Sequence, residues 1–446
     1  MERKFLKVGH FPTLLGSFLY FDISFMVWVM VGALGVYISQ DLGLTPTQKG
    51  LVTAFPVLGG ALLRIPFGII ADKIGCKRTG IIGMMLTFVP LFWGWLFANS
   101  VSDFIALGLL LGTAGASFAV ALPMASRWYP KEYQGLVMGI AGAGNSGTLI
   151  STLFAPRLAS IYGWQNVFAL YMIPLALTLG AFTFFTKESS NKEIKRVSEY
   201  ARLLRSKDVL ALAFLYSVTF GGFVGFSSYL GIFFHDHYGL NAIDAGTFTT
   251  VCILAGSFFR PIGGYLADRI GGVKMLLLLL SSASVTTIGV AQLPSLYIAI
   301  VLLFTTMLFL GMGNGSIFQL VPLRFPKQIG LATGLVGAVG GLGGFMLPLT
   351  LGTVRDLAGS YGFGFGLFSL GSMLGVALLK TGILTWTYSV KVAPLISAPI
   401  IPNVSVYEGE SSSNNIKIGL GEAYYTPLAV EKSKDGSSPK PRWSGQ

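Results

Sequence analysis

The sequence predicts an all-α integral membrane protein with twelve transmembrane helices in two pseudo-symmetric six-helix halves. Three observations support this fold class. Hydrophobic residues make up 53% of the 446 positions and charged residues 11%, against about 25% charged in soluble domains. Apolar runs of roughly 20 residues, enough to cross a bilayer, recur along the chain. Motifs of the first half also return in the second half at a constant spacing.

The apolar pattern defines twelve spans, few of which have the polar face of a soluble surface helix. The expected spans are residues 12–38, 47–71, 79–98, 102–126, 134–158, 164–186, 208–234, 243–267, 274–292, 295–322, 328–354 and 361–386. The first span follows a basic N-terminus, and it is too long for a signal peptide and lacks a small-residue cleavage site. It therefore reads as a retained helix.

A charged segment, "TKESSNKEIKRVSEYARLLRSKD", interrupts the apolar pattern at 186–208. It separates an N-terminal six-helix half, residues 1–186, from a C-terminal half, residues 208–386, with residues 187–207 as a cytoplasmic linker. Residues 387–446 are polar and rich in Ser, Pro and Lys. Such a composition buries too little apolar surface to fold, so a disordered cytoplasmic tail is expected.

Lysine and arginine set the expected orientation. With both termini inside, the inner connections carry 19 Lys and Arg and the outer ones carry three, as the positive-inside rule requires of a cytoplasmic (inner) membrane protein. The net charge of +12 is then a topological signal and a contact with lipid headgroups. No basic stripe with interleaved aromatics suggests nucleic acid. The two cysteines, Cys76 and Cys252, suggest neither a disulfide nor a metal site, and no cofactor is expected.

Two arginines lie inside expected spans. Arg64 in "ALLRIPFGIIADKIG" and Arg260 in "GSFFRPIGGYLADRIGG" are 196 positions apart and share the pattern of small and acidic residues that follows. Arg64 precedes Asp72, at the end of its span, by eight residues, which at 1.5 Å per residue places it roughly 12 Å deep. A charge there costs about 2.5–3.5 kcal/mol and usually faces a cavity or a partner.

An acidic partner for both arginines is missing. Asp22 in the first span is the one acid at similar depth, and a single carboxylate does not fully satisfy two guanidinium groups. We therefore expect a mobile anion to complete the site at the interface between the halves. Guanidinium suits bidentate contact with planar oxyanions, so nitrate, nitrite, formate, bicarbonate and small carboxylates all qualify.

Glycine accounts for 58 of the 446 residues, nearly twice the usual proportion of about 7%, and it clusters in "GIAGAGNSG" and "GLVGAVGGLGG". Small residues let transmembrane helices approach closely, and packing alone explains most of them. Among the glycines of these two expected helices, the signature positions are Gly142, Gly144, Gly147, Gly337, Gly340, Gly341, Gly343 and Gly344. Asn145, an amide in mid-span, needs either a neighbouring backbone group or the substrate as its partner.

Acidic and basic residues adjoin at the cytoplasmic ends of spans 2 and 8. Asp72 and Asp268 follow the two arginines at equal distance, and Arg78 and Arg127 lie in nearby inner loops. These charges could bind facing helix N-termini and one another. Because they recur in both halves, we interpret them as a cytoplasmic gate rather than only a loop-stabilising cluster.

Several of these segments resemble one family. "GIIADKIGCKR" resembles the loop motif of the major facilitator superfamily, and "GIAGAGNSG" and "GLVGAVGGLGGFMLP" resemble the paired signatures of its nitrate/nitrite porter family. "FDISFMVW" and "LYSVTFGGFVGFS" fit the same family. The resemblance covers residues 12–386 and implies the major facilitator fold, a monomer, and nitrate clamped by Arg64 and Arg260. It also implies a pocket lined by Asn145, Tyr216, Phe118 and Phe220.

The predicted function is secondary transport of nitrate or nitrite by alternating access, with no enzymatic activity. Proton-coupled uptake for nitrate assimilation needs a titratable group, and arginine cannot serve, so Asp22 is the candidate for proton coupling. Nitrate/nitrite antiport needs only the two arginines. Two further alternatives stay open, a carrier of formate- or oxalate-type carboxylates and a nitrate receptor that signals through residues 390–446.

Overall fold

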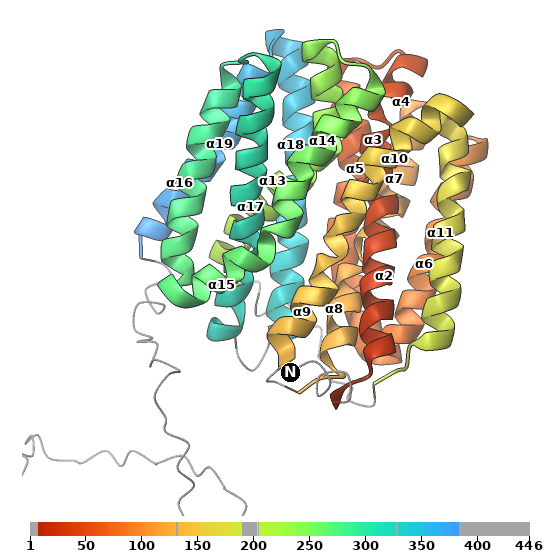
Figure 1. Ribbon diagram of the computed structural model, residues 1–446, viewed down its shortest axis with the longest axis vertical. Coiled ribbons are helices and arrows are strands. Elements are labelled where there is room, and N and C mark those ends of the chain that lie inside the picture. Colours follow the sequence, from red (N-terminus) through yellow and green to blue (C-terminus); the bar gives the residue numbers. More distant parts are fainter. Residues whose placement is uncertain (1–7, 131–132, 190–202, 204, 326–328, 383–446) are drawn as a thin grey trace, which may run out of the picture. The chain divides into compact units, whose positions relative to one another are not determined.

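A computed structural model of the chain describes residues 8–130, 133–189, 203, 205–325 and 329–382. Within these ranges the regular structure is helical and contains no strand. Figure 1 shows the helices side by side in two groups, α2–α11 and α13–α19. The expected tail, 387–446, and most of the expected linker, 187–207, lie outside the described residues.

The first group begins with capped helices. Thr45 and Gln48 form a capping box at the start of α5, and Ser100 and Asp103 form another at the start of α7, which satisfies the exposed N–H groups of each first turn. The elements are α2 (Phe11–Trp28), α3 (Met30–Ala33), α4 (Gly35–Asp41), α5 (Pro46–Ile74), α6 (Cys76–Leu96), α7 (Val101–Gly115), α8 (Phe118–Ser126), α9 (Gln134–Gly142), the 3₁₀ turn η2 (Ala143–Ser146), α10 (Gly147–Tyr162) and α11 (Trp164–Phe185).

The second group repeats this arrangement. Gly75 ends α5 with φ of +104°, and Gly271, 196 positions later, ends α15 with φ of +93°, a backbone region that favours glycine. The elements are α13 (Lys207–Tyr238), α14 (Ala242–Phe258), α15 (Arg260–Ile270), α16 (Gly272–Ala291), α17 (Leu296–Arg324), α18 (Ile329–Ala358) and α19 (Gly362–Lys380).

The close approach of helices repeats in the same way. A Cβ added at Gly115 of α7 would lie 2.9 Å from the Cα of Gly60 in α5. A Cβ added at Gly311 of α17 would collide with the backbone of Gly256 in α14. Both pairs are related by the offset of 196 that relates Arg64 to Arg260. The internal repeat in the sequence is therefore also a repeat of helix contacts.

The expected all-α membrane fold is confirmed. Eleven helical segments among the described residues are long and apolar enough to cross a membrane. The expected span at 134–158 is not among these eleven because it is divided into α9, η2 and α10. Three other expected spans are interrupted as well, the first at Val29 and Leu34, the fourth at 116–117 and the eighth at Phe259. Interrupted helices free backbone groups in mid-membrane, which is typical of transporter binding sites.

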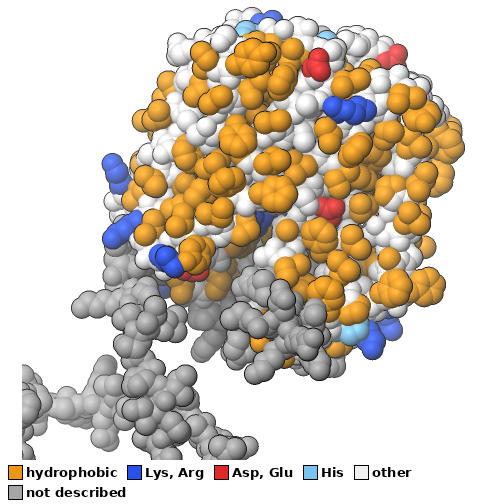
Figure 2. All heavy atoms as spheres, in the orientation of Figure 1, with side chains coloured by type: hydrophobic (Ala, Val, Ile, Leu, Met, Phe, Trp, Pro, Cys, Tyr) orange, Lys and Arg blue, Asp and Glu red, His pale blue; other side chains and the backbone are white. Residues whose placement is uncertain are grey.

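The surface matches a membrane environment. Figure 2 shows apolar side chains spread over most of the visible lateral face and charged side chains mainly near its two ends. We call the end where α11 ends and α13 begins the linker face (lower in Figure 1), and the other end, where α4 ends and α5 begins, the opposite face.

Candidate functional site

Arg64 occupies the centre of the interface between the halves. It lies in α5 with 2% of its surface exposed. Its Nη1 donates to the carbonyl of Gly337 in α18 at 2.6 Å, and its Nε donates to the carbonyl of Gly115 at 3.3 Å. Since Gly337 belongs to the second half, the arginine side chain connects the two halves. Its Nη2 is buried and has no hydrogen-bond partner among the described residues.

The Gly115 carbonyl is available because α7 ends there. In a continuous helix this oxygen would accept from the N–H of Ala119. The N–H of Ala119 instead donates to Ala116, and that of Ser117 to Ala114. The break at 116–117 thus turns a backbone carbonyl toward Arg64, which explains why the interruption lies at this depth.

Arg260 stands at a second break. It is the first residue of α15, directly after the interruption at Phe259. Pro261 follows it, and a proline inside a helix removes one backbone hydrogen bond and clashes with the preceding turn. The Arg260 side chain is partly exposed, and its Cζ lies 5.3 Å from the centre of the Phe318 ring. Its Nη1 is buried and unpartnered.

Aromatic rings surround the Arg64 guanidinium, and one of the neighbouring rings, Phe318, contacts Arg260. The Cζ of Arg64 lies 4.9 Å from the ring centre of Phe220, 5.2 Å from that of Phe118 and 5.6 Å from that of Trp28. Tyr216 stacks on Phe220 with ring centres 4.9 Å apart. Phe318 contacts both Tyr216 and Phe118, so rings of both halves form one continuous aromatic cluster that extends from Arg64 to Arg260.

The electrostatics of this cluster favour an anion. The charges of Arg64 and Arg260 are close enough to repel each other, and the Tyr216 hydroxyl lies within electrostatic reach of both. No carboxylate in the described part of the chain pairs with either arginine. The Tyr216 hydroxyl is also buried without a well-formed hydrogen bond. Two cations and several unused donors in a low-dielectric setting are costly unless a negative ligand completes them.

The glycines of α18 fit the helix into this site. At Gly340 a Cβ would collide with the Tyr216 ring, at Gly343 with the backbone of Ser217, and at Gly341 it would lie 2.8 Å from the Cβ of Ala61. A Cβ added at Gly344 would lie 2.9 Å from Cγ1 of Val57. Gly337 is different, because a Cβ there would make ordinary contacts. Gly337 contributes its carbonyl oxygen to Arg64 instead.

The glycines of the divided fifth span serve two purposes. Gly144 packs against Phe21, 2.5 Å from a Cβ position, and Gly147 lies directly against the backbone of Asp22. Both therefore let η2 and α10 approach α2. A Cβ at Gly142 would meet nothing within 4 Å, so Gly142 faces open space in this structure.

Asn145 and Asp22 lie on this same contact. Asn145 in η2 is 2% exposed and its Oδ1 has no partner, but no contact in the described structure joins it to the arginines. Asp22 is 6% exposed. Its carboxylate accepts from the Ser146 hydroxyl at 2.6 Å and from the N–H of Gly147, the first residue of α10. A helix N-terminus favours such an anion.

Of the four residues interpreted as a gate, two are paired. Arg127 donates through Nη2 to Asp72 at 2.6 Å, with both side chains 15% exposed, and through Nη1 to the Cys76 sulfur at 3.2 Å. This links α5 to the residue that ends α8 within the first half. Arg78 and Asp268 are exposed, and neither forms a hydrogen bond or ion pair with another described residue.

The halves are joined most firmly at the opposite face. Lys49 of α5 pairs with Asp236 of α13 at 2.7 Å, and Asp236 also accepts from the Tyr361 hydroxyl at 3.1 Å. Thr47 donates to Asp356 at 2.6 Å. Thr152 of α10 and Thr250 of α14 are hydrogen-bonded at 2.8 Å, Gln40 contacts His235, and Arg157 donates to Thr247.

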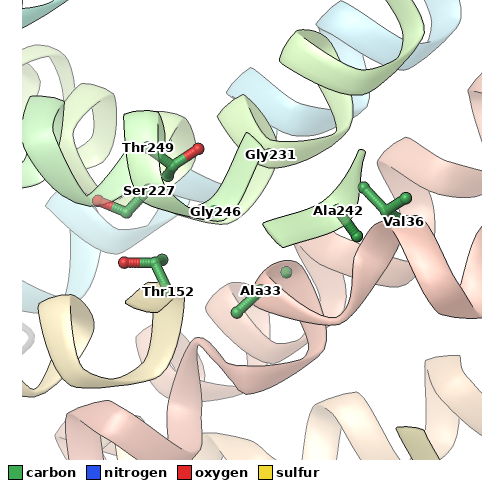
Figure 3. Close-up of a pocket in the computed structure, with 9 residues that line it drawn as sticks. Ala33, Val36, Thr152, Ser227, Gly231, Ala242, Gly246 and Thr249 are labelled. Carbon is green, nitrogen blue, oxygen red and sulfur yellow. The ribbon is translucent and has the colours of Figure 1, made fainter. Parts of the chain in front are cut away.

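Two hollows lie away from the arginines. A cavity of about 10 Å³ lies between α3, α10, α13 and α14, with Thr152, Ser227 and Thr249 among its lining residues (Figure 3), and it has room for at most one water. A second hollow, of about 210 Å³, lies between α2 and α11 and is lined by apolar residues such as Phe11, Leu15 and Phe185. Neither is built to hold an anion.

The structure adds residues that sequence reasoning missed. Trp28 closes one side of Arg64 and donates through Nε1 to the carbonyl of Pro56 at 2.6 Å. Phe318 contacts Arg260, and Gly115 supplies a carbonyl. Aromatic residues at helical spacing look like ordinary packing in a sequence. The sequence signal that could have pointed to Trp28 is its position six residues after Asp22 in the same expected span. In the structure, Gly60 and Gly115 make room for the Trp28 ring.

Comparison with known proteins identifies a matching family and several similar proteins. The model of the Major Facilitator Superfamily matches residues 16–348. A protein named "Nitrite extrusion protein" from Bacillus subtilis is 36% identical over 366 residues, covering 82% of this chain and 91% of its own. Proteins named "Probable nitrate transporter NarT" from Staphylococcus haemolyticus and Staphylococcus carnosus are 34% and 35% identical, covering 79% and 80% of this chain and 91% and 92% of their own. A transporter, rather than an enzyme, is thereby confirmed.

Proposed function

This chain belongs to the major facilitator superfamily of membrane carriers, and on that premise we propose that it transports nitrate or nitrite across the cytoplasmic membrane by alternating access. The observation that carries the proposal is the pair of arginines, one from each half, that lie within electrostatic reach of each other, contact aromatic rings and have no carboxylate partner among the described residues. The names of the relatives narrow the anion to nitrate and nitrite.

The chemistry of the site supports a planar oxyanion. Guanidinium presents parallel donors that match two oxygens of such an anion. The unpaired Nη2 of Arg64 and Nη1 of Arg260 are available for such contacts without breaking any existing bond. The rings of Phe118, Phe220 and Phe318 exclude water from the site, which strengthens each electrostatic contact. Asn145, with its unbonded amide oxygen, lies on the adjacent break and borders the site in this proposal.

The contacts between the halves support alternating access. The opposite face is closed by polar ties between the halves, whereas toward the linker face a Cβ at Gly142 of α9 or at Gly334 of α18 would meet nothing within 4 Å. With the linker face in the cytoplasm, as the distribution of basic residues predicts, this is an inward-facing carrier. An anion that bridges Arg64 and Arg260 removes their repulsion, so it favours closure of the linker side. Asp72, Arg127, Arg78 and Asp268 form the gate on that side.

Proton coupling is the proposed source of energy, with Asp22 as the proton carrier. Its carboxylate is buried, has no cationic partner among the described residues, and joins α2 to η2 and α10 through Ser146 and Gly147. Protonation would remove the charge that the α10 N-terminus stabilises and would loosen this contact. Nitrate/nitrite antiport is the alternative, because the arginines alone would require an anion in both directions of movement.

Uptake of labelled nitrate into proteoliposomes tests the function and the coupling together. One set of vesicles has only an inward proton gradient, and another has only internal nitrite. Accumulation with the proton gradient that is lost in an Asp22→Asn variant supports the symporter. Uptake only against internal nitrite makes the protein an antiporter. Movement of formate or oxalate in place of nitrate would contradict the assignment of the anion.

Arginine variants tie any flux to the site. Arg64→Lys and Arg260→Lys keep the charge and lose the planar fork, and each should raise the KM for nitrate at least about 10-fold, the cost of one charge-assisted hydrogen bond. Arg269→Lys, at an exposed position of α15, is the matched control and should transport normally. Equal KM values for all three variants would show that the anion binds elsewhere.

A further inference from the structure

Asn314 is a buried amide without any hydrogen bond. It lies in α17 with 1% of its surface exposed, and both its Nδ2 and its Oδ1 lack partners in the described structure. Each unsatisfied buried polar group costs free energy comparable to a lost hydrogen bond. An amide that contributed only to helix packing would be better replaced by leucine, so its polar atoms call for a ligand.

The neighbours of Asn314 show which way it faces. Gly313 packs against Thr219 of α13, 2.7 Å from a Cβ position, and Gly315 packs against the backbone of Arg260. Phe318, one turn along α17 and hence on the same face as Asn314, contacts the Arg260 guanidinium and the Tyr216 ring. Asn314 therefore lies between the helix that carries Tyr216 and the helix that carries Arg260.

Other unused polar atoms gather around this position. Among the described residues, the Thr219 hydroxyl and the Nη1 of Arg260 are buried without a hydrogen-bond partner, and the Tyr216 hydroxyl, which interacts with Arg260, forms no well-aligned hydrogen bond. Each of these groups is a donor, and only the hydroxyls also accept. A site with a surplus of donors is completed by an anion with several acceptor oxygens, and the amide oxygen of Asn314 can take up one of the donors that the anion leaves free.

We propose that Asn314 is a further ligand of the transported oxyanion, with Nδ2 donating to an anion oxygen and Oδ1 accepting from Arg260 or Thr219. This assignment rests on the proposed function and extends it to a residue of the second half. An amide donates without adding a third positive charge to a site that already holds two, and it does not titrate, so its contribution is the same at every physiological pH.

The assignment also predicts selectivity. A planar oxyanion offers separate oxygens to the arginines and to Asn314, whereas chloride offers a single centre that all the donors would have to share. Loss of the amide should therefore lower the affinity for nitrate more than the affinity for chloride. A purely structural role of Asn314 would weaken both anions equally or not at all.

Binding to the purified full-length chain in detergent tests this. The variant is Asn314→Leu, which keeps the branching at Cγ and has no polar atoms, and the control is Gln319→Leu. Gln319 also has an unbonded buried oxygen and lies on α17, but it faces Gly272 of α16. Nitrate, nitrite and chloride affinities are measured by the anion-induced shift in Tm, together with the Tm without anion.

Asn314→Leu should lower the affinity for nitrate about 10- to 100-fold, which corresponds to the loss of one hydrogen bond to a charged partner. The affinity for chloride should change less. Its Tm without anion should equal or exceed that of the unaltered chain, because an unsatisfied amide has been removed. Gln319→Leu should bind nitrate normally. Asn314→Asp, nearly the same size, should bind nitrate still more weakly because a carboxylate repels the anion.

Normal nitrate binding by Asn314→Leu or Asn314→Asp would overturn the assignment and leave the proposed function intact. Absence of nitrate and nitrite binding by the unaltered chain would overturn both. If neither variant folds while Gln319→Leu does, Asn314 is required for the fold, and the assignment as a ligand also fails.

Discussion

The two ends of the interface between the halves use the same kind of residue and pack it differently. Toward the opposite face, Gly343 and Gly344 of α18 have no room for a side chain. Toward the linker face, a Cβ at Gly334 of α18, or at Gly139 or Gly142 of α9, would meet nothing within 4 Å. The glycines of one signature are thus fully packed at one end and unpacked at the other.

This difference shows what an alternating carrier needs from glycine. Toward the opposite face, Gly343 and Gly344 let α18 pack closely against α13 and α5. The ion pair between Lys49 and Asp236 also joins the halves at that face. At the linker face the glycines of α9 and α18 have no close neighbour at the Cβ position, and in the proposed alternating-access cycle they provide the surface along which these two helices come together when that side closes. The same residues then explain packing in one state and movement to the other.

The largest expected effect comes from substituting the packed end. Gly343→Ala places a methyl group against the backbone of Ser217, and such overpacking costs about 1–3 kcal/mol. The Tm of the purified protein should fall and transport should be lost. Gly334→Ala, nine residues earlier in α18, is the matched control and should leave the Tm unchanged or raise it. Equal Tm values for the two variants would remove the distinction between the ends.

Next comes the ion pair of the opposite face. Asp236→Asn leaves Lys49 partly buried without a counter-ion, which should favour opening of this face by about 1–3 kcal/mol, between the values for exposed and buried pairs. A cysteine at Val36, beside the cavity in Figure 3, should then react faster with an impermeant maleimide. Both native cysteines are buried, so their background reaction is slow.

The control for this experiment is Asp208→Asn. It removes the pair between Asp208 and Arg324, which are 2.6 Å apart within the second half at the linker face, and should leave the labelling of a cysteine at Val36 unchanged. Acceleration by Asp208→Asn to the same degree as by Asp236→Asn would mean that labelling reports general loosening and not the opening of one face.

A smaller effect on stability, with a clear effect on turnover, is expected at the open end. Gly142→Ala meets no neighbour in this structure, so the Tm and the affinity for nitrate should not fall. The added methyl group hinders only the closed linker side, so the maximal transport rate should drop while the KM stays near normal. An unchanged transport rate would show that Gly142 is not part of the closing surface.

The smallest expected effect is a pH dependence of the Tm that arises from His10 at the linker face. His10 accepts the N–H of Thr13 through Nδ1 and so caps α2, and partial burial and the charge of Lys187 lower the pKa of His10. A lowered pKa in the folded state means that this stabilisation is present above about pH 6.5 and is lost as the pH falls below it. The Tm should therefore decrease slightly between pH 7.5 and 5.5. His10→Asn, which caps without titrating, should show a smaller decrease. An equal decrease in both proteins would assign the effect to other groups.

The fold could be predicted from the sequence because its signals are strong and local. Apolar runs of span length, separated by basic loops, define membrane helices almost unaided, and the offset between Arg64 and Arg260 revealed the repeat. The arginines stood out because a charge in mid-span is expensive. The structure then places Arg64 beside Phe118, Phe220 and Tyr216, residues that only the family resemblance had suggested.

What the sequence could not show depends on backbone geometry. The partners of Arg64 are the carbonyls of Gly337 and Gly115, and every residue has a carbonyl, so no residue type points to them. The binding of Asp22 to Ser146 depends on the η2 break, which the apolar pattern does not reveal. Asn314 was overlooked for the same reason, because an amide among glycines looks like packing until its missing hydrogen bonds are known.

The central claim is that Arg64 and Arg260 hold one anion between the two halves. Nitrate affinity of the purified protein, measured for Arg64→Gln, Arg260→Gln and the double variant, tests it most directly. If both arginines bind the same ion, each single variant should lose most of the nitrate affinity. The nitrate affinity of the double variant should then be only slightly lower than that of the weaker-binding single variant. Nitrate affinity that survives in the double variant would show that Arg64 and Arg260 do not hold the anion.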